Sequence, residues 1–273
     1  MNALKLSSIF LYLGLANAAA LLPRVSGSPV SSVASGPSPS ASSVGSNSFT
    51  ITLNGDWGQN NPTTYGYFQA PPNVSSPDGQ PTTYSNLWFK QKVALNGTGN
   101  VQFTASYYAF TGTSPSSPAP GVTISSSMVL SVTLGVAGSP GTNGSSINMT
   151  VSDGIPSIQA VTATAGPMCF SIHTQAGTFD PSDNFLIGIA QQDPTTSITH
   201  IVPVSVFLAD PGATYTICPL INIYMSTGTF TQDTMVSIGE QSDTGDCNYN
   251  AVGATSNCEI THADDGTWPV VWN

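Results

Sequence analysis

The stretch SINMTV at residues 146–151 alternates polar and apolar side chains, and this alternation decides the fold class. Successive side chains of an extended strand point to opposite faces, so Ile147, Met149 and Val151 share one face. Asn148 lies on the opposite face. A period of two predicts a half-buried β-strand that turns Asn148 toward solvent.

The same pattern recurs from Phe49 onward, and no window of a dozen residues has helical periodicity. Runs rich in Val, Ile, Thr and aromatic residues alternate with Gly, Pro, Asn and Asp, which is typical of strands joined by turns. We expect strands at 49–53, 87–95, 101–110, 122–134, 146–151, 157–164, 167–174, 185–190, 200–208, 214–225, 234–239 and 268–272. About ten to twelve strands in residues 49–273 predict an all-β domain, a single antiparallel β-sandwich or jelly roll.

Two local features refine these strands. The alternation in residues 167–174 predicts that Met168 and Phe170 share a buried face. Proline cannot donate a hydrogen bond to a sheet, so Pro203 and Pro219 predict edge strands or bulges.

The N-terminus has the pattern of an export signal. Lys5 supplies a positive charge, residues 9–15 are apolar, and Ala-Asn-Ala at 16–18 offers the small residues that signal peptidase accepts. The apolar run is shorter than the about 20 residues of a membrane span. We expect a signal peptide at 1–18, a Ser/Pro-rich flexible segment at 19–48, and a protein secreted to the extracellular space or the cell wall.

Charged residues form only 7% of the chain, against about 25% in an ordinary soluble domain. The chain has 14 Asp+Glu and a formal net charge of −10, and beyond Arg24 its basic residues are Lys90 and Lys92. Nucleic acid and anionic membrane surfaces attract rows of basic side chains, so neither is an expected partner. Polysaccharide or glycan surfaces are the expected partners. The sequence carries no signal for an oligomeric state.

Four N-x-[ST] sequons agree with export and predict a glycoprotein. They begin at Asn73, Asn96, Asn143 and Asn148. In two of them the asparagine is followed by glycine, a dipeptide typical of tight turns, so we expect these two sugars on exposed hairpin tips.

An even number of cysteines in an exported chain indicates disulfides. Three pairings of Cys169, Cys218, Cys247 and Cys258 are possible, and we favour Cys169–Cys218 with Cys247–Cys258. Zinc is disfavoured because there is no C-x₂-C spacing and the three histidines are far apart. Oxygen-rich stretches near 180–184 and 243–248 leave calcium as a weaker alternative, although neither matches an EF-hand loop. We therefore expect no metal and no cofactor.

The chain lacks the G-x-S-x-G, G-x-x-x-x-G-K-[ST] and H-E-x-x-H motifs. Glu240 and Glu259, which flank the expected Cys247–Cys258 bridge, are the remaining candidates for a catalytic carboxylate pair. The alternative interpretation of these acids is a solvated loop. Aspartates followed by proline, at 180, 193 and 210, are typical turn initiators. A secreted acid hydrolase is thus a second hypothesis for the function.

Aromatic residues are concentrated in the region 56–88, which is rich in Gly, Pro, Asn and Gln and resembles long loops. Exposed rings beside amides can hold sugars by stacking, which makes Trp57, Tyr65, Tyr67 and Trp88 candidate ligand-binding residues. The competing interpretation is core packing, since each ring can bury a large apolar area. The first hypothesis is therefore a non-catalytic glycoprotein that binds carbohydrate, and the third is a structural or host-interaction surface protein.

Overall fold

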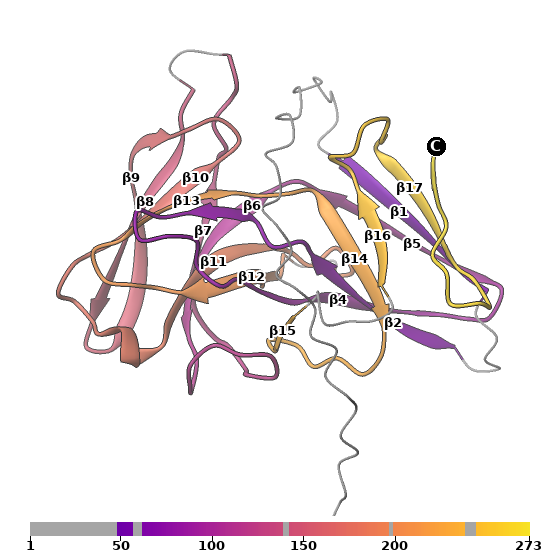
Figure 1. Ribbon diagram of the computed structural model, residues 1–273, viewed down its shortest axis with the longest axis horizontal. Helices are drawn as coiled ribbons and strands as arrows, with labels where there is room; N and C mark the ends of the chain where they lie inside the picture. The colour runs from indigo at the N-terminus through magenta and orange to yellow at the C-terminus, as the bar shows by residue number, and fades with distance from the viewer. Residues whose placement is uncertain (1–47, 57–61, 139–141, 197–198, 238–243) are drawn as a thin grey trace, which may run out of the picture. The chain divides into compact units, whose positions relative to one another are not determined.

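The computed structural model describes residues 48–56, 62–138, 142–196, 199–237 and 244–273 (Figure 1). These residues form eighteen strands and a single 3-10 turn, η1 (Pro181–Asp183), which confirms the predicted all-β class with more strands than expected. None of them belongs to a helix long and apolar enough to cross a membrane. The expected signal peptide and all but the last residue of the Ser/Pro-rich segment lie outside the described ranges.

The largest sheet is built mainly from the middle of the chain. Its described strands are β2 (Thr63–Gln69), β4 (Tyr84–Val93), β6 (Tyr107–Thr113), β7 (Ser125–Val132), β11 (Phe185–Gln192), β12 (Ile201–Leu208), β14 (Asn222–Thr227), β15 (Met235–Val236) and β16 (Thr244–Asn248). They run in the order β16-β14-β2-β4-β12-β11-β6-β7, and β15 pairs with β4. Every pairing among them is antiparallel.

Two smaller sheets complete the described structure. The first contains β1 (Ser48–Gly55), β5 (Gly97–Thr104), β17 (Asn257–His262) and β18 (Val270–Trp272), in the order β18-β17-β1-β5. The second contains β3 (Asn73–Ser75), β8 (Gly144–Ser152), β9 (Ile155–Ala165), β10 (Phe170–Thr174) and β13 (Thr214–Cys218), in the order β3-β13-β10-β8-β9. Because β1 pairs with β17 and β10 with β8 in parallel, the fold is not purely antiparallel as predicted.

All three sheets contribute to one large hydrophobic cluster, represented by Ile51 on β1, Phe170 on β10 and Phe207 on β12. A smaller cluster that includes Leu186 and Val206 also involves the large sheet. Adjacent residues of β11 and β12 thus enter different clusters, as expected when both faces of a sheet are covered. Burying such side chains is worth roughly 1.5–3 kcal/mol each.

The expected strand faces are partly confirmed. Ile147 and Met149 are buried and Asn148 is exposed, as the alternation predicts. Met168 is 52% exposed at a positive φ of 58°, so its predicted burial is wrong and β10 begins only at Phe170. At Pro203 the register between β11 and β12 shifts, which confirms a bulge there.

Long apolar runs proved to be pairs of strands. Residues 101–110 divide between β5 and β6, and residues 214–225 divide between β13 and β14 on either side of Pro219. Strands β2, β3, β16 and β17 were not expected from the sequence. β3, β16 and β17 are short or rich in polar residues, so their β-propensity signal is weak. β2 is rich in Thr and aromatic residues, but it lies in a stretch rich in Gly, Pro, Asn and Gln, which resembles long loops.

Both disulfides confirm the favoured pairing. Cys169–Cys218 joins the residue before β10 to the end of β13, and Cys247–Cys258 joins β16 of the large sheet to β17 of a small one. Each is worth roughly 3–4 kcal/mol in the chain-entropy treatment of loop closure. Two disulfides also indicate an oxidising environment.

Candidate functional site

The predicted aromatic platform is not exposed. Tyr65, Tyr67 and Trp88 are only 1%, 0% and 1% exposed, so the expectation that these rings face a ligand is wrong. Tyr67 stacks on Phe89 with ring centroids 4.2 Å apart, and both belong to the large hydrophobic cluster. Trp57 lies outside the described residues.

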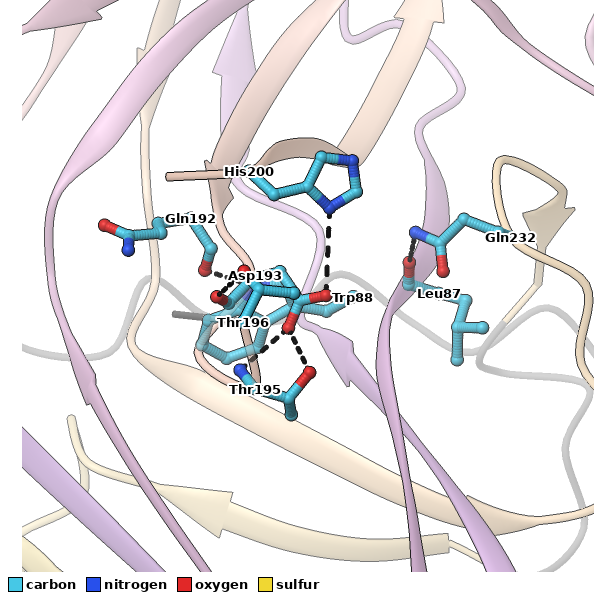
Figure 2. Close-up of polar contacts among 8 residues, drawn as sticks. All are labelled: Leu87, Trp88, Gln192, Asp193, Thr195, Thr196, His200 and Gln232. Carbon is cyan, nitrogen blue, oxygen red and sulfur yellow. Dashed lines mark hydrogen bonds and ion pairs between the residues drawn. The ribbon is translucent and has the colours of Figure 1, made fainter. Parts of the chain in front are cut away.

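Trp88 is directed inward by a β-bulge. Tyr67 pairs with Phe89 and Phe68 with Leu87, so Trp88 is the extra residue of β4. Its indole Nε1 donates a hydrogen bond to the main-chain oxygen of Gln192 at 2.9 Å (Figure 2). A buried tryptophan with a satisfied N–H is a core residue.

The turn that follows Gln192 contains an ordered aspartate. The Asp193 Oδ1 atom accepts hydrogen bonds from the amide and the hydroxyl of Thr195, at 2.8 and 2.7 Å, and this confirms its turn-initiating role (Figure 2). His200 places Nδ1 3.9 Å from Asp193 Oδ2, an ion pair when the imidazole is protonated. Because the threonine hydroxyl bonds to the carboxylate rather than to the imidazole, these residues do not form a nucleophile–base–acid relay.

The predicted carboxylate pair is only half described. Glu259 Oε1 accepts a hydrogen bond from Asn54 and Oε2 accepts one from Asn273, both at 2.9 Å. Both oxygens of Glu259 thus accept hydrogen bonds from amide groups, one on β1 and one directly after β18. Glu240 lies outside the described residues, so its distance from Glu259 stays untested.

His262 is a core histidine. It is fully buried, its ring stacks on Trp268 with centroids 4.0 Å apart, and its Nδ1 lies 3.2 Å from the Tyr65 hydroxyl oxygen. Within the described ranges no group of three His, Cys, Asp or Glu side chains is arranged to hold a metal ion.

The four sequon asparagines, Asn73, Asn96, Asn143 and Asn148, are all exposed. Asn96 lies in a turn closed by a hydrogen bond from the Gly97 amide to the Ala94 oxygen at 2.9 Å. This turn connects β4 and β5, which belong to different sheets, so it is not a hairpin tip. Glycosylation stays a prediction that this exposure permits.

Two grooves meet at Gly228, Thr229 and Phe230, directly after β14. The first, here called the lysine groove, has a volume of about 380 Å³ and is lined by Thr64, Lys90, Gln91, Lys92 and residues 228–230. The second, the Met235 groove, has a volume of about 400 Å³ and is lined by Pro120, Gly121, Thr227, residues 228–230, Thr231, Thr234, Met235, Val236 and Ser237. Both grooves are lined in part by residues 228–230, and together they are called the paired grooves.

The shape of these grooves depends on the close approach of the Phe230 ring to Gly66 on β2. A Cβ atom on Gly66 would lie 2.5 Å from the Phe230 ring, so the absence of a side chain allows the ring to lie on β2. The ring also meets the edge of Phe68 with centroids 5.0 Å apart. Lys90 Nζ donates a hydrogen bond to the Phe230 main-chain oxygen at 3.2 Å, which ties the segment to β4.

The described lining of the paired grooves carries mainly uncharged polar groups. It offers threonine and serine hydroxyls, one glutamine, an aromatic ring and two lysines, and it contains no carboxylate. Such a surface can hydrogen-bond a hydroxyl-rich ligand and contact its apolar faces.

No protein-family model, curated protein or solved structure matches this chain. The geometry of the described residues is therefore the basis for a functional assignment.

The described aromatic residues that the sequence suggested as a binding site lie in the same sheet as the paired grooves, but they do not line them. The density of rings in residues 56–88 drew attention to Tyr65, Tyr67 and Trp88, which pack inward, and away from Phe230. Phe230 stands in the stretch TGTFTQD at 227–233, where an isolated ring among small polar residues is the signal that could have identified it. Lys90 and Lys92 were visible as the remaining cations, but their shared groove depends on a segment distant in sequence.

Proposed function

We propose that this protein is a secreted, non-catalytic glycoprotein that binds polysaccharide in the paired grooves. The observation that carries the proposal is the pair of adjacent grooves around Phe230, whose described lining has hydroxyl groups, a partly exposed phenylalanine and no carboxylate. Ligand sites are typically concave, with volumes of about 300–1,000 Å³ and a few polar groups that orient the ligand. Each groove has a volume in this range.

The shape favours a chain-like ligand over a single sugar. The two grooves, of about 380 and 400 Å³, lie on either side of the shared residues 228–230. A polysaccharide crossing this segment would place successive units in each groove and contact the Phe230 ring between them. Such a ligand gains affinity from several weak contacts along its length.

Secretion and glycosylation are part of the same proposal. The two disulfides suit an oxidising compartment, and the four exposed sequons allow sugars to be attached without disturbing the core. The N-terminal pattern of residues 1–18 supports export.

A secreted acid hydrolase is the less favoured alternative. Glycoside hydrolysis needs two carboxyl groups about 5–9.5 Å apart around the scissile bond. Glu259 uses both oxygens to bind Asn54 and Asn273, and the described groove lining contains no carboxylate. A structural or host-interaction role remains the interpretation if no polysaccharide binds.

The test is a pull-down of the secreted protein on a panel of soluble and immobilised polysaccharides. We expect Phe230→Ala to weaken retention by about tenfold or more, the loss typical of a central aromatic anchor. Thr229→Val removes a lining hydroxyl without disturbing the ring and should weaken retention as well.

Ile155→Ala, which truncates an exposed apolar side chain on β9, is the matched control and should bind as the unaltered protein does. Circular dichroism and thermal unfolding verify that each variant is folded. Failure of every polysaccharide to bind, or unchanged binding by both groove variants, would overturn the proposal.

A further inference from the structure

We propose that the polysaccharide bound in the paired grooves is anionic and that its negative groups pair with Lys90 and Lys92. This inference rests on the proposed function and names the class of its ligand. It begins from where the chain places its few positive charges.

Lys90 and Lys92 line the same groove although the chain is strongly acidic. The whole sequence has 14 Asp+Glu and 4 Lys+Arg, and the other two basic residues, Lys5 and Arg24, precede the described domain. Both basic residues of the described domain therefore lie at one site. A random surface placement would not favour this arrangement, whereas a ligand of opposite charge would.

Strand geometry directs the two ammonium groups to the same side. Lys90 and Lys92 are two residues apart on β4, so their side chains leave the same face of the sheet. Their Cα atoms are separated by roughly 6.5–7 Å along the strand. That spacing lets each lysine contact a different negative group of a polymer with regularly repeated charges.

Neither lysine is neutralised within the described residues. The ion pair between His200 and Asp193 is the sole salt bridge there, and the described lining of the lysine groove contains no Asp or Glu. Lys90 donates one hydrogen bond to the main-chain oxygen of Phe230, which positions the ammonium group beside that segment. An ammonium group has three N–H donors, so two of them remain for a ligand.

The net charge of −10 repels an anionic polymer at long range, but salt limits this repulsion. The Debye length is about 8 Å at physiological ionic strength, so distant carboxylates act weakly on a ligand in the groove. Hydrogen bonds between ions of opposite charge are roughly twice as strong as neutral ones. The nearby ammonium groups therefore act on a ligand in the groove more strongly than each distant carboxylate does.

Calorimetric titration with four polymers tests the inference. The probes are a polyuronate, the same polymer with its carboxylates methyl-esterified, a sulfated polysaccharide and a neutral polysaccharide. We expect the polyuronate, the sulfated polymer or both to bind about tenfold more tightly than the neutral probes, which corresponds to about 1.4 kcal/mol. This preference should shrink when ionic strength rises from about 0.05 M to about 0.5 M.

The double variant Lys90→Gln/Lys92→Gln should lose the preference for charged polymers. Lys92→Gln alone, which keeps the hydrogen bond from Lys90 to the Phe230 oxygen, should reduce this preference, and thermal unfolding verifies that both variants are folded. The matched control, Gln159→Glu/Thr162→Glu at two exposed positions of β9, changes the net charge by the same amount away from the groove and should keep the preference. The lysine inference alone is overturned if neutral polymers bind in a Phe230-dependent manner without preference for charge. It is also overturned if the lysine variant keeps the preference. If no polymer of either kind binds, the proposed function itself is wrong.

Discussion

The Phe230 ring lies over Gly66, at a position where a Cβ atom would come within 2.5 Å of the ring. A glycine inside a strand normally weakens the sheet, because it has no side chain to pack. Here the missing side chain lets a segment distant in sequence fold onto β2 and form the shared wall of the paired grooves.

Gly66→Ala should destabilise the protein because the new methyl group forces the Phe230 ring away from β2. We expect the free energy of unfolding to fall by about 1–3 kcal/mol, as in other overpacked sites, and polysaccharide retention to fall with it. Denaturant unfolding measures the first effect. Gly166→Ala is the control, since a Cβ there meets no atom within 4 Å, and it should be neutral or slightly stabilising.

Trp88→Phe should reduce stability without reducing the affinity for polysaccharide. The substitution removes the hydrogen bond from Nε1 to the Gln192 oxygen and part of a buried ring, a loss of about 1–3 kcal/mol. Binding should be unchanged because Trp88 does not line the paired grooves. A folded Trp88→Phe protein that no longer binds would contradict the expected independence of the paired grooves from this core position.

Asp233→Asn should stabilise the protein at neutral pH. Burial raises the pKa of Asp233, and the opposing attraction of His200 does not cancel this effect. Because the pKa in the folded protein is higher than in the unfolded chain, the folded state binds the proton more tightly. The stability associated with Asp233 is therefore greatest in acid, and it falls as the pH rises past the usual aspartate pKa of about 4.

The gain from Asp233→Asn should be present at pH 7 and should shrink toward about pH 3, as measured by thermal unfolding at each pH. Asn also tolerates the positive φ of 57° at this position. Asp153→Asn, at a φ of 52° on an exposed turn, controls for the backbone effect. A variant less stable than the unaltered protein at pH 7 would contradict this explanation.

Cys247→Ala/Cys258→Ala should weaken the connection between the large sheet and the sheet of β1, β5, β17 and β18. The bridge joins β16 to β17, and its loss should lower the free energy of unfolding by about 2–5 kcal/mol. Replacing both cysteines avoids a free thiol. Equal denaturation midpoints for the variant and the unaltered protein would show that packing alone holds these strands together.

The sequence was most informative where short-range patterns determine the outcome. The alternation in residues 146–151 correctly predicted that Ile147 and Met149 are buried and Asn148 is exposed, although Val151 is only half-buried, and the favoured cysteine pairing is the observed one. Sheet partners were not predictable in this way. The parallel pairing of β1 with β17 joins opposite ends of the described chain, and no local pattern records it.

The candidate site illustrates the same limit. The sequence does not distinguish an aromatic residue of the core from one that stacks on sugar. The burial of Tyr65 and Tyr67 depends on which face of β2 meets the hydrophobic cluster. The paired grooves require Gly66 on β2, Lys90 on β4 and Phe230 after β14 to meet in space. Their contact is a product of tertiary packing.

The most direct test of the central claim is a nuclear magnetic resonance titration of the ¹⁵N-labelled protein with a short oligouronate. If the paired grooves bind polysaccharide, the largest chemical-shift changes should occur at the amides of Thr64, Lys92, Thr229 and Phe230. The Phe230→Ala variant should lose these changes. Shift changes confined to other surfaces, such as the exposed face of β9, would contradict a binding site at Phe230.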